Sequence, residues 1–149
     1  MNKLERCRLA MEYHKRGFNC GQSVLEAFRD KIGLSEEQCR SIGTGLGGGF
    51  RYGGICGAAS GAVLVLGMLH PHNEESAAQK AETAKLVKEL VGRFAGQFND
   101  KTDCRDLLQE RELQAVPEVA ELGATKHCET LIISSVAILY DYLEELNKE

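Results

Sequence analysis

Apolar residues recur every three to four positions along most of this chain, which is the spacing of one face of an α-helix. The clearest case is residues 76–98, where the apolar positions share one face and the charged positions lie opposite. No segment shows a persuasive strand pattern, and residues 117–126 are predicted as a less regular connector. The pattern predicts helices over residues 3–16, 20–31, 36–41, 56–69, 76–98, 104–114 and 128–146.

Residue types at the ends of these segments support the same boundaries. Asn19 is a good N-cap for the second helix, and Ser35 begins a capping box that ends in Gln38. On the first helix, Leu4, Cys7, Met11 and His14 share the inward face. We therefore expect an all-α fold, a single compact domain over residues 1–149 with about five to seven helices and a glycine-rich loop.

Length and charge exclude several classes of protein. The chain has 149 residues, which suits one domain, and its net charge of −4 without a basic block argues against a nucleic-acid partner. The longest uncharged apolar run, residues 55–69, is shorter than the roughly 20 residues of a membrane span. The charged N-terminus has no apolar signal region behind it. We expect a cytoplasmic protein that does not bind membranes.

Residues 43–54 form a loop in which seven of twelve positions are glycine. The loop contains a G-x-G-x-x-G sequence, but it lacks the preceding strand and the later acidic residue of a dinucleotide site. It is either a flexible turn or a place where backbone amides approach a group bound near Cys56. In the second case Arg51 and Tyr52 orient a substrate or partner, although a solvated arginine explains the pattern equally well. The candidate cofactor-binding residues are Gly48, Gly49, Gly54 and Gly57.

The six cysteines are widely separated, and no C-x-x-C pair is present. Four of them lie in the first turn of a predicted helix, where free backbone amides and the helix dipole lower a thiol pKa and favour the thiolate. Cys7 and Cys39 lack that setting, and we expect them to be packing residues. The four cysteines at predicted helix starts are Cys20, Cys56, Cys104 and Cys128.

These cysteines and the glycines around Cys56 resemble the pattern of the C_GCAxxG_C_C family of redox-active proteins. The likeness covers about residues 3–145, and its most specific part is the glycine–cysteine stretch, where Ile55 separates the glycine from Cys56. The resemblance implies a helical fold, four motif cysteines and a redox or metal-linked role. A looser likeness to the cluster-binding part of split-Soret cytochromes favours an iron–sulfur centre. The matching residues are 18–24, 47–61, 104–108 and 128.

Three functions remain open. The first is electron transfer to a redox partner protein through an iron–sulfur cluster held by Cys20, Cys56, Cys104 and Cys128. The second is a metal-free thiol–disulfide oxidoreductase with Cys20 and Cys56 as its catalytic thiols. The third is a non-catalytic domain with a structural zinc ion, or a homodimer joined through residues 56–69.

The histidines add weaker candidates. His127 adjoins Cys128 and is a candidate base or hydrogen-bond partner for its thiol. His70 and His72 flank a proline at a spacing that sometimes binds metal, but we expect this pair to lie in an exposed turn.

Overall fold

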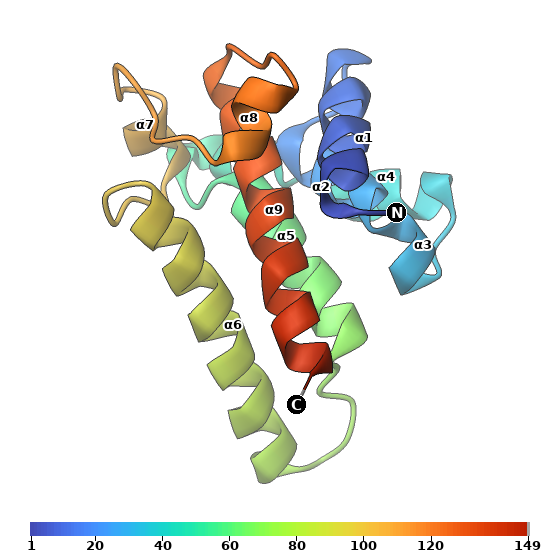
Figure 1. Cartoon of the computed structure of the whole chain (residues 1–149). Helices are drawn as coiled ribbons and strands as arrows, with labels where there is room; N and C mark the ends of the chain where they lie inside the picture. The colour runs from blue at the N-terminus through green and yellow to red at the C-terminus, as the bar shows by residue number, and fades with distance from the viewer. Residues whose placement is uncertain (149) are drawn as a thin grey trace.

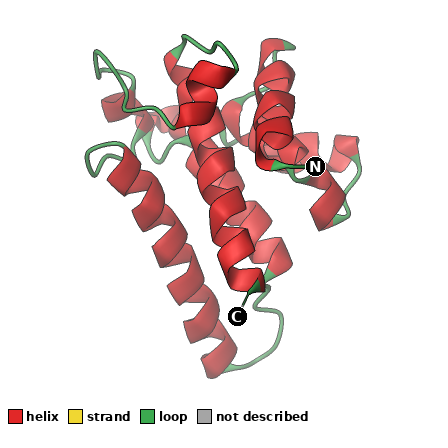
Figure 2. Ribbon diagram, viewed as in Figure 1, coloured by secondary structure: helices red, strands yellow, loops and turns green. Residues whose placement is uncertain are grey.

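The computed structural model of this chain describes residues 1–148, and within them the fold is helical throughout (Figures 1 and 2). The only pairing of extended backbone there is a single antiparallel bridge between Ile55 and Asp103. The helices are α1 (Lys3–Lys15), α2 (Cys20–Ala27), α3 (Arg29–Ile32), α4 (Glu36–Gly43), α5 (Gly57–Leu69), α6 (Ala77–Gln97), α7 (Cys104–Leu107), α8 (Pro117–Glu121) and α9 (His127–Asn147).

Helix α9 is the centre of the fold. It contacts α1, α2, α5, α6 and α8, and Figure 1 shows it running through the middle of the molecule. Its apolar face is among the most buried parts of the chain, with Ile132, Ile133 and Leu139 fully shielded from solvent. Ser135 adds a polar tie, because its hydroxyl donates a 2.7 Å hydrogen bond to the Ala58 carbonyl at the start of α5.

Helices α2 and α5 cross at very short range because glycines meet at the crossing. A Cβ atom on Gly61 would lie 2.9 Å from the Gly21 carbonyl oxygen and 3.2 Å from the Gly21 Cα. The absence of side chains at these positions allows the two helices to approach so closely. Ala58 and Ala62 are also buried, so the small residues of α5 contribute to packing inside the chain.

The structure has more helices than the five to seven expected, and the extra ones are short. The predicted helix over residues 20–31 is broken at Phe28, which leaves helical geometry at φ −119° and ψ 13°. Residues 117–121, expected to be part of a connector, form α8 with Pro117 at its first position, where the missing amide hydrogen costs nothing.

The predicted helix over residues 104–114 is wrong in length, because α7 ends at Leu107. Beyond that point, two backbone carbonyls form hydrogen bonds with side chains from other elements. His127 Nε2 lies 2.5 Å from the Glu110 oxygen, and Gln97 donates to the Gln114 oxygen at 2.7 Å. Tertiary hydrogen bonds therefore replace the helical ones in this segment.

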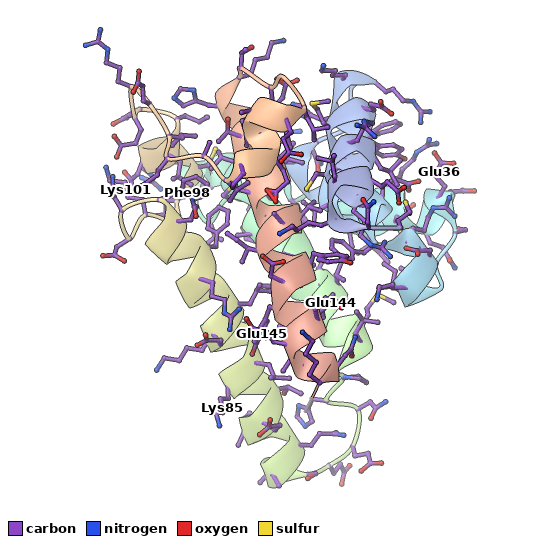
Figure 3. The ribbon with its side chains drawn as sticks, in the orientation of Figure 1. Glu36, Lys85, Phe98, Lys101, Glu144 and Glu145 are labelled. Atoms are coloured by element: carbon purple, nitrogen blue, oxygen red, sulfur yellow. The ribbon has the colours of Figure 1, made fainter. Side chains whose placement is uncertain are left out.

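Charged side chains cover the outer faces of the long helices. Figure 3 labels Lys85 on α6 and Glu144 on α9, and both side chains are exposed. Arg93 of α6 bridges to Glu145 of α9 at 2.6 Å, which ties the two helices together at their surface. Among residues 1–148, no helix combines the length and the apolar character that crossing a bilayer requires.

The glycine-rich loop contains one tight left-handed turn. Four consecutive residues, 48–51, have φ between 56° and 63°, and two of them are not glycine. The turn, η1 (Gly49–Gly53), is closed by a 3.0 Å hydrogen bond from the Gly54 amide to the Gly49 oxygen. Phe50 and Arg51 therefore adopt a conformation that side chains with a Cβ rarely take. The loop is neither a regular helix nor a strand, as predicted, but it has a defined shape.

Candidate functional site

Cysteines from four separate segments of the chain line one cavity of about 540 Å³. They are the four that the sequence singled out, and all are free thiols. The cavity wall also contains polar side chains from the start of α2, glycines of the loop, and two leucines. The four cysteines in the wall are Cys20, Cys56, Cys104 and Cys128.

Each of these cysteines stands at the beginning of a helix. Cys20 is the first residue of α2, Cys56 is the N-cap of α5, Cys104 is the first residue of α7, and Cys128 is the second residue of α9. The predicted placement in first helical turns is confirmed. The cavity is therefore the point at which four helix starts converge.

The bridge between residues 55 and 103 joins two of these starts. The Cys56 amide donates to the Thr102 oxygen at 2.8 Å, and the Cys104 amide donates to the Gly54 oxygen at 2.7 Å. The segment before α7 is thus hydrogen-bonded to the segment before α5. This pairing brings Cys104, which is distant in sequence, to the same cavity as Cys56.

Cys20 and Cys56 form a hydrogen-bonded pair of thiols with opposite pKa shifts. The Cys56 thiol donates to the Cys20 sulfur, and this bond is the main reason that the pKa of Cys20 falls from 9.0 to about 6. Backbone hydrogen bonds from Gly21 and Gly48 favour the Cys20 thiolate further, against the effect of burial. The same pairing, together with burial, raises the pKa of Cys56 well above 9.0. At neutral pH the pair carries one proton, held on Cys56.

Two glycines make room for this pair. A Cβ on Gly57 would lie 2.4 Å from the Cys20 Sγ, so any other residue at position 57 would displace that sulfur. Gly48 lies at φ 63°, and its backbone amide faces the Cys20 sulfur. Both glycines line the cavity. The sequence proposed them as cofactor-binding residues, and in the structure they lie beside a thiol.

The other two proposed glycines lie elsewhere. Gly49 and Gly54 are not part of the cavity wall. They close the left-handed turn through their mutual hydrogen bond, and the Gly54 oxygen also accepts from Cys104. Their contribution is to hold the backbone around the cavity in shape.

The prediction that a helix start lowers the pKa of all four thiols is wrong for three of them. Burial raises the pKa of Cys104 and Cys128, and the negative charge of Cys20 raises both further. Among the four cavity cysteines, only Cys20 receives hydrogen bonds that lower its thiol pKa by more than burial raises it. Within residues 1–148, no three His, Cys, Asp or Glu side chains are gathered as the ligands of one metal ion.

The remaining cysteines lie in the core. Cys7 is fully buried, its thiol faces the Ile133 oxygen at 3.6 Å, and burial raises its pKa to about 12. Cys39 is 1% exposed, and burial raises its pKa as well. Both match the expected packing role.

His14 also belongs to the site, although it was not predicted as a site residue. It lines the cavity, and its Nδ1 donates to the Phe18 oxygen at 2.9 Å. Its place on the inward face of the first helix was visible, but nothing in the sequence showed that this face reaches the cysteines. His127 instead binds the Glu110 carbonyl, and neither His70 nor His72 lines the cavity.

The N-cap Asn19 also lines the cavity and fixes its rim. Its side-chain oxygen accepts from the Gln22 amide at 2.8 Å, and its amide nitrogen donates to the Gly43 oxygen at 3.0 Å. The start of α2 is therefore tied to the end of α4. This tie positions Cys20, the next residue, under the glycine loop.

The arrangement of cysteines matches a known pattern. The signature described as "Putative redox-active protein (C_GCAxxG_C_C)" matches residues 18–142, which is most of the chain and includes all four cavity cysteines. The chain belongs to the C_GCAxxG_C_C family. Membership confirms the resemblance seen in the sequence and gives the four cysteines a redox-linked family context. No curated protein and no solved structure gives a significant match.

Proposed function

We propose that this C_GCAxxG_C_C protein is a thiol–disulfide oxidoreductase whose redox pair is Cys20 and Cys56. The observation that carries the proposal is that Gly57, the residue after Cys56, lies directly against the Cys20 sulfur, so that both thiols meet in one cavity wall and the Cys56 thiol lowers the pKa of Cys20 to about 6. A thiolate that exists at neutral pH is the attacking species in disulfide exchange. Cys20 lies in the wall of an open cavity, where a substrate sulfur can reach it.

The two thiols have different roles in the exchange. The Cys20 thiolate attacks one sulfur of a substrate disulfide, forms a mixed disulfide, and releases the other sulfur as a thiolate. Cys56, 3% exposed, then loses its proton to the solvent or to the departing thiolate and attacks the Cys20 sulfur. The Cys20–Cys56 disulfide forms, the second substrate thiolate leaves, and two electrons have passed from the protein to the substrate.

A thiol count against a redox buffer tests this function. The protein, purified without oxygen and with its metal content measured, is equilibrated with glutathione at increasing oxidised fractions and then alkylated. We expect two of six thiols to be lost in one two-electron step. Cys20→Ala and Cys56→Ala should abolish the step, and Cys39→Ala, which removes a core thiol, should retain it. Loss of no thiols in the wild type would contradict the proposal.

A second candidate function is a metal or iron–sulfur centre, because all four cavity cysteines are chemically suited to hold one. Thiolates are the usual ligands of iron–sulfur clusters and of structural zinc, and here four thiols share one cavity. Cys20, Cys56, Cys104 and Cys128 would hold the group, and a cluster would supply one-electron transfer to a redox partner protein. The direct pairing of two of the four thiols, Cys20 with Cys56, favours the dithiol.

Metal analysis distinguishes the candidates. Iron and acid-labile sulfide in protein purified without oxygen, lost in Cys104→Ser and Cys128→Ser, would support the cluster. Stoichiometric zinc in a colourless protein would support the structural site. The dithiol proposal expects neither in stoichiometric amount, and it expects Cys104→Ser to retain the two-thiol oxidation.

A further inference from the structure

Arg51 is held over the redox cavity by the left-handed turn. Its φ of 56° and that of Phe50, 58°, are costly for residues with a Cβ, and such strain persists only where the surroundings impose it. The turn directs the Arg51 side chain back across the glycines that precede it. The distance from a Cβ built on Gly48 to Arg51 Cδ would be 3.5 Å. Gly48 is also the residue whose amide faces Cys20.

Glycine at position 47 leaves the space that the guanidinium occupies. A Cβ on Gly47 would lie 3.2 Å from Arg51 Nη2 and 2.8 Å from the Asn19 Cβ. The guanidinium thus lies beside Asn19, the residue before Cys20. Arg51, Asn19 and Cys20 all belong to the wall of the same cavity.

The charge of Arg51 is not balanced by the protein around it. The chain has 22 acidic residues, yet no aspartate or glutamate lines the cavity. Within residues 1–148, the exposed side chain of Arg51 forms no ion pair and no hydrogen bond with the protein, whereas that of Arg105, on the other side of the turn, donates to the oxygens of Gly53 and Tyr52. An arginine held at a cavity without a carboxylate partner leaves its donors available for an anionic ligand.

We propose that Arg51 binds a carboxylate of the substrate, and that the substrate is a low-molecular-weight disulfide carrying that carboxylate. The inference rests on the proposed dithiol function and adds the class of substrate. A cavity of about 540 Å³ suits such a molecule. With the carboxylate on Arg51, the Cys20 thiolate attacks the nearer substrate sulfur and expels the other as a thiolate. Cys56 completes the exchange as described above, so the disulfide gains the two electrons that the dithiol loses.

Three disulfides of similar size and different charge test this proposal. The probes are dithiodipropionate, which is anionic, 2-hydroxyethyl disulfide, which is neutral, and cystamine, which is cationic. The second-order rate constant for loss of the Cys20 thiolate is measured with each at pH 7 and low ionic strength. Arg51→Gly should slow the anionic probe about tenfold, the loss expected for one charge-assisted contact. It should leave the neutral probe within about twofold and should not slow cystamine.

Two variants at the same turn serve as controls. Phe50→Gly relieves the same backbone strain next to Arg51 without removing its charge, and it should keep the wild-type rate with all three probes. Arg51→Lys should retain part of the preference for the anion. Because glycine is favoured at φ 56°, Arg51→Gly is expected to fold.

The possible failures are distinct. If wild-type protein reacts with all three probes and Arg51→Gly changes none of the rates, the carboxylate subsite is wrong and the dithiol stands. Equal slowing of all three, with a raised pKa in alkylation by neutral iodoacetamide, would show that Arg51 acts on Cys20 and not on the substrate. If the wild type reacts with none of the probes, the dithiol function itself fails.

Discussion

Gly57 lies directly against the sulfur of Cys20. The first residue of α5 thus borders the first residue of α2, at a separation that a single methyl group would close. The contact explains how the Cys20 thiol of α2 reaches the start of α5, where the Cys56 thiol donates a hydrogen bond to it. The absence of a side chain at position 57 is part of the redox site.

Gly57→Ala is expected to displace Cys20 and break the pair. The added methyl would stand 2.4 Å from the sulfur and 2.5 Å from the Leu46 oxygen, so the sulfur must move away from Cys56. We expect the pKa of Cys20 to rise and its alkylation by iodoacetamide at pH 7 to slow about tenfold or more. The measurement is the alkylation rate with mass-spectrometric assignment of the modified cysteine.

Gly67→Ala provides the matched control on the same helix. Gly67 is exposed, and a Cβ there would meet nothing within 4 Å. Replacing a helical glycine by alanine should stabilise the fold by about 0.5–1 kcal/mol. Cys20 should alkylate at the wild-type rate. If Gly57→Ala behaved like Gly67→Ala, the contact would have no chemical consequence.

The reactivity of Cys20 should depend on pH with a midpoint near 6. Because its pKa is lowered from 9.0 to about 6, the reactive thiolate is present above that pH and is lost as the pH falls through it. Cys56→Ala removes the donor that contributes most, so the midpoint should move upward. Cys56→Ser retains a hydroxyl donor and should move it less. The test is the iodoacetamide rate between pH 5 and 9, and an unchanged midpoint in Cys56→Ala would refute the assigned cause.

The left-handed turn should be intolerant of side chains at one position in particular. A Cβ on Gly49 would lie 2.2 Å from the Gly54 oxygen, at a φ of 62°. We expect Gly49→Ala to destabilise the protein by about 2–4 kcal/mol, through backbone strain and overpacking together. Gly45→Ala, in the same loop with open space around it, should stay within about 0.5 kcal/mol. Urea unfolding measures both, and equal effects would show that the turn is not rigid.

Much of the fold could be predicted because local patterns agree with tertiary packing. The long amphipathic period of residues 76–98 corresponds to α6, and the cap residues Asn19 and Ser35 begin helices as predicted. The failures lie where tertiary contacts decide. Buried Phe28 leaves helical geometry, and its ring lies under the Arg6 guanidinium. After Leu107, the carbonyls of Glu110 and Gln114 form hydrogen bonds with side chains from other elements. The residues adjacent in sequence show no pattern that would predict either set of contacts.

The site was predictable in its residues but not in its chemistry. Helix-start positions identified the four cysteines that line the cavity, and family resemblance pointed to the same set. Which two of them pair depends on the crossing of α2 over α5 at Gly21 and Gly61, a contact between residues forty positions apart. The opposite pKa shifts of Cys20 and Cys56 follow from that contact, so periodicity and spacing could not provide them.

Variants of Cys104 and Cys128 distinguish a dithiol site from a centre that needs all four cysteines. Both line the cavity, but burial keeps their thiols protonated, with raised pKa values. We expect Cys104→Ala and Cys128→Ala to keep the two-thiol oxidation. The negative charge on Cys20 raises the pKa of both thiols, so losing it should make each easier to deprotonate. Loss of all redox activity in either variant would instead favour a centre that needs four ligands.

Peptide mapping of the oxidised protein shows directly whether Cys20 and Cys56 form the redox pair. The wild-type chain, purified without oxygen, is treated with one equivalent of disulfide, blocked with an alkylating agent and digested without reduction. We expect a single intramolecular disulfide that joins the peptide containing Cys20 to the peptide containing Cys56, with the other four cysteines alkylated. A different pairing, or six alkylated cysteines after oxidation, would contradict it.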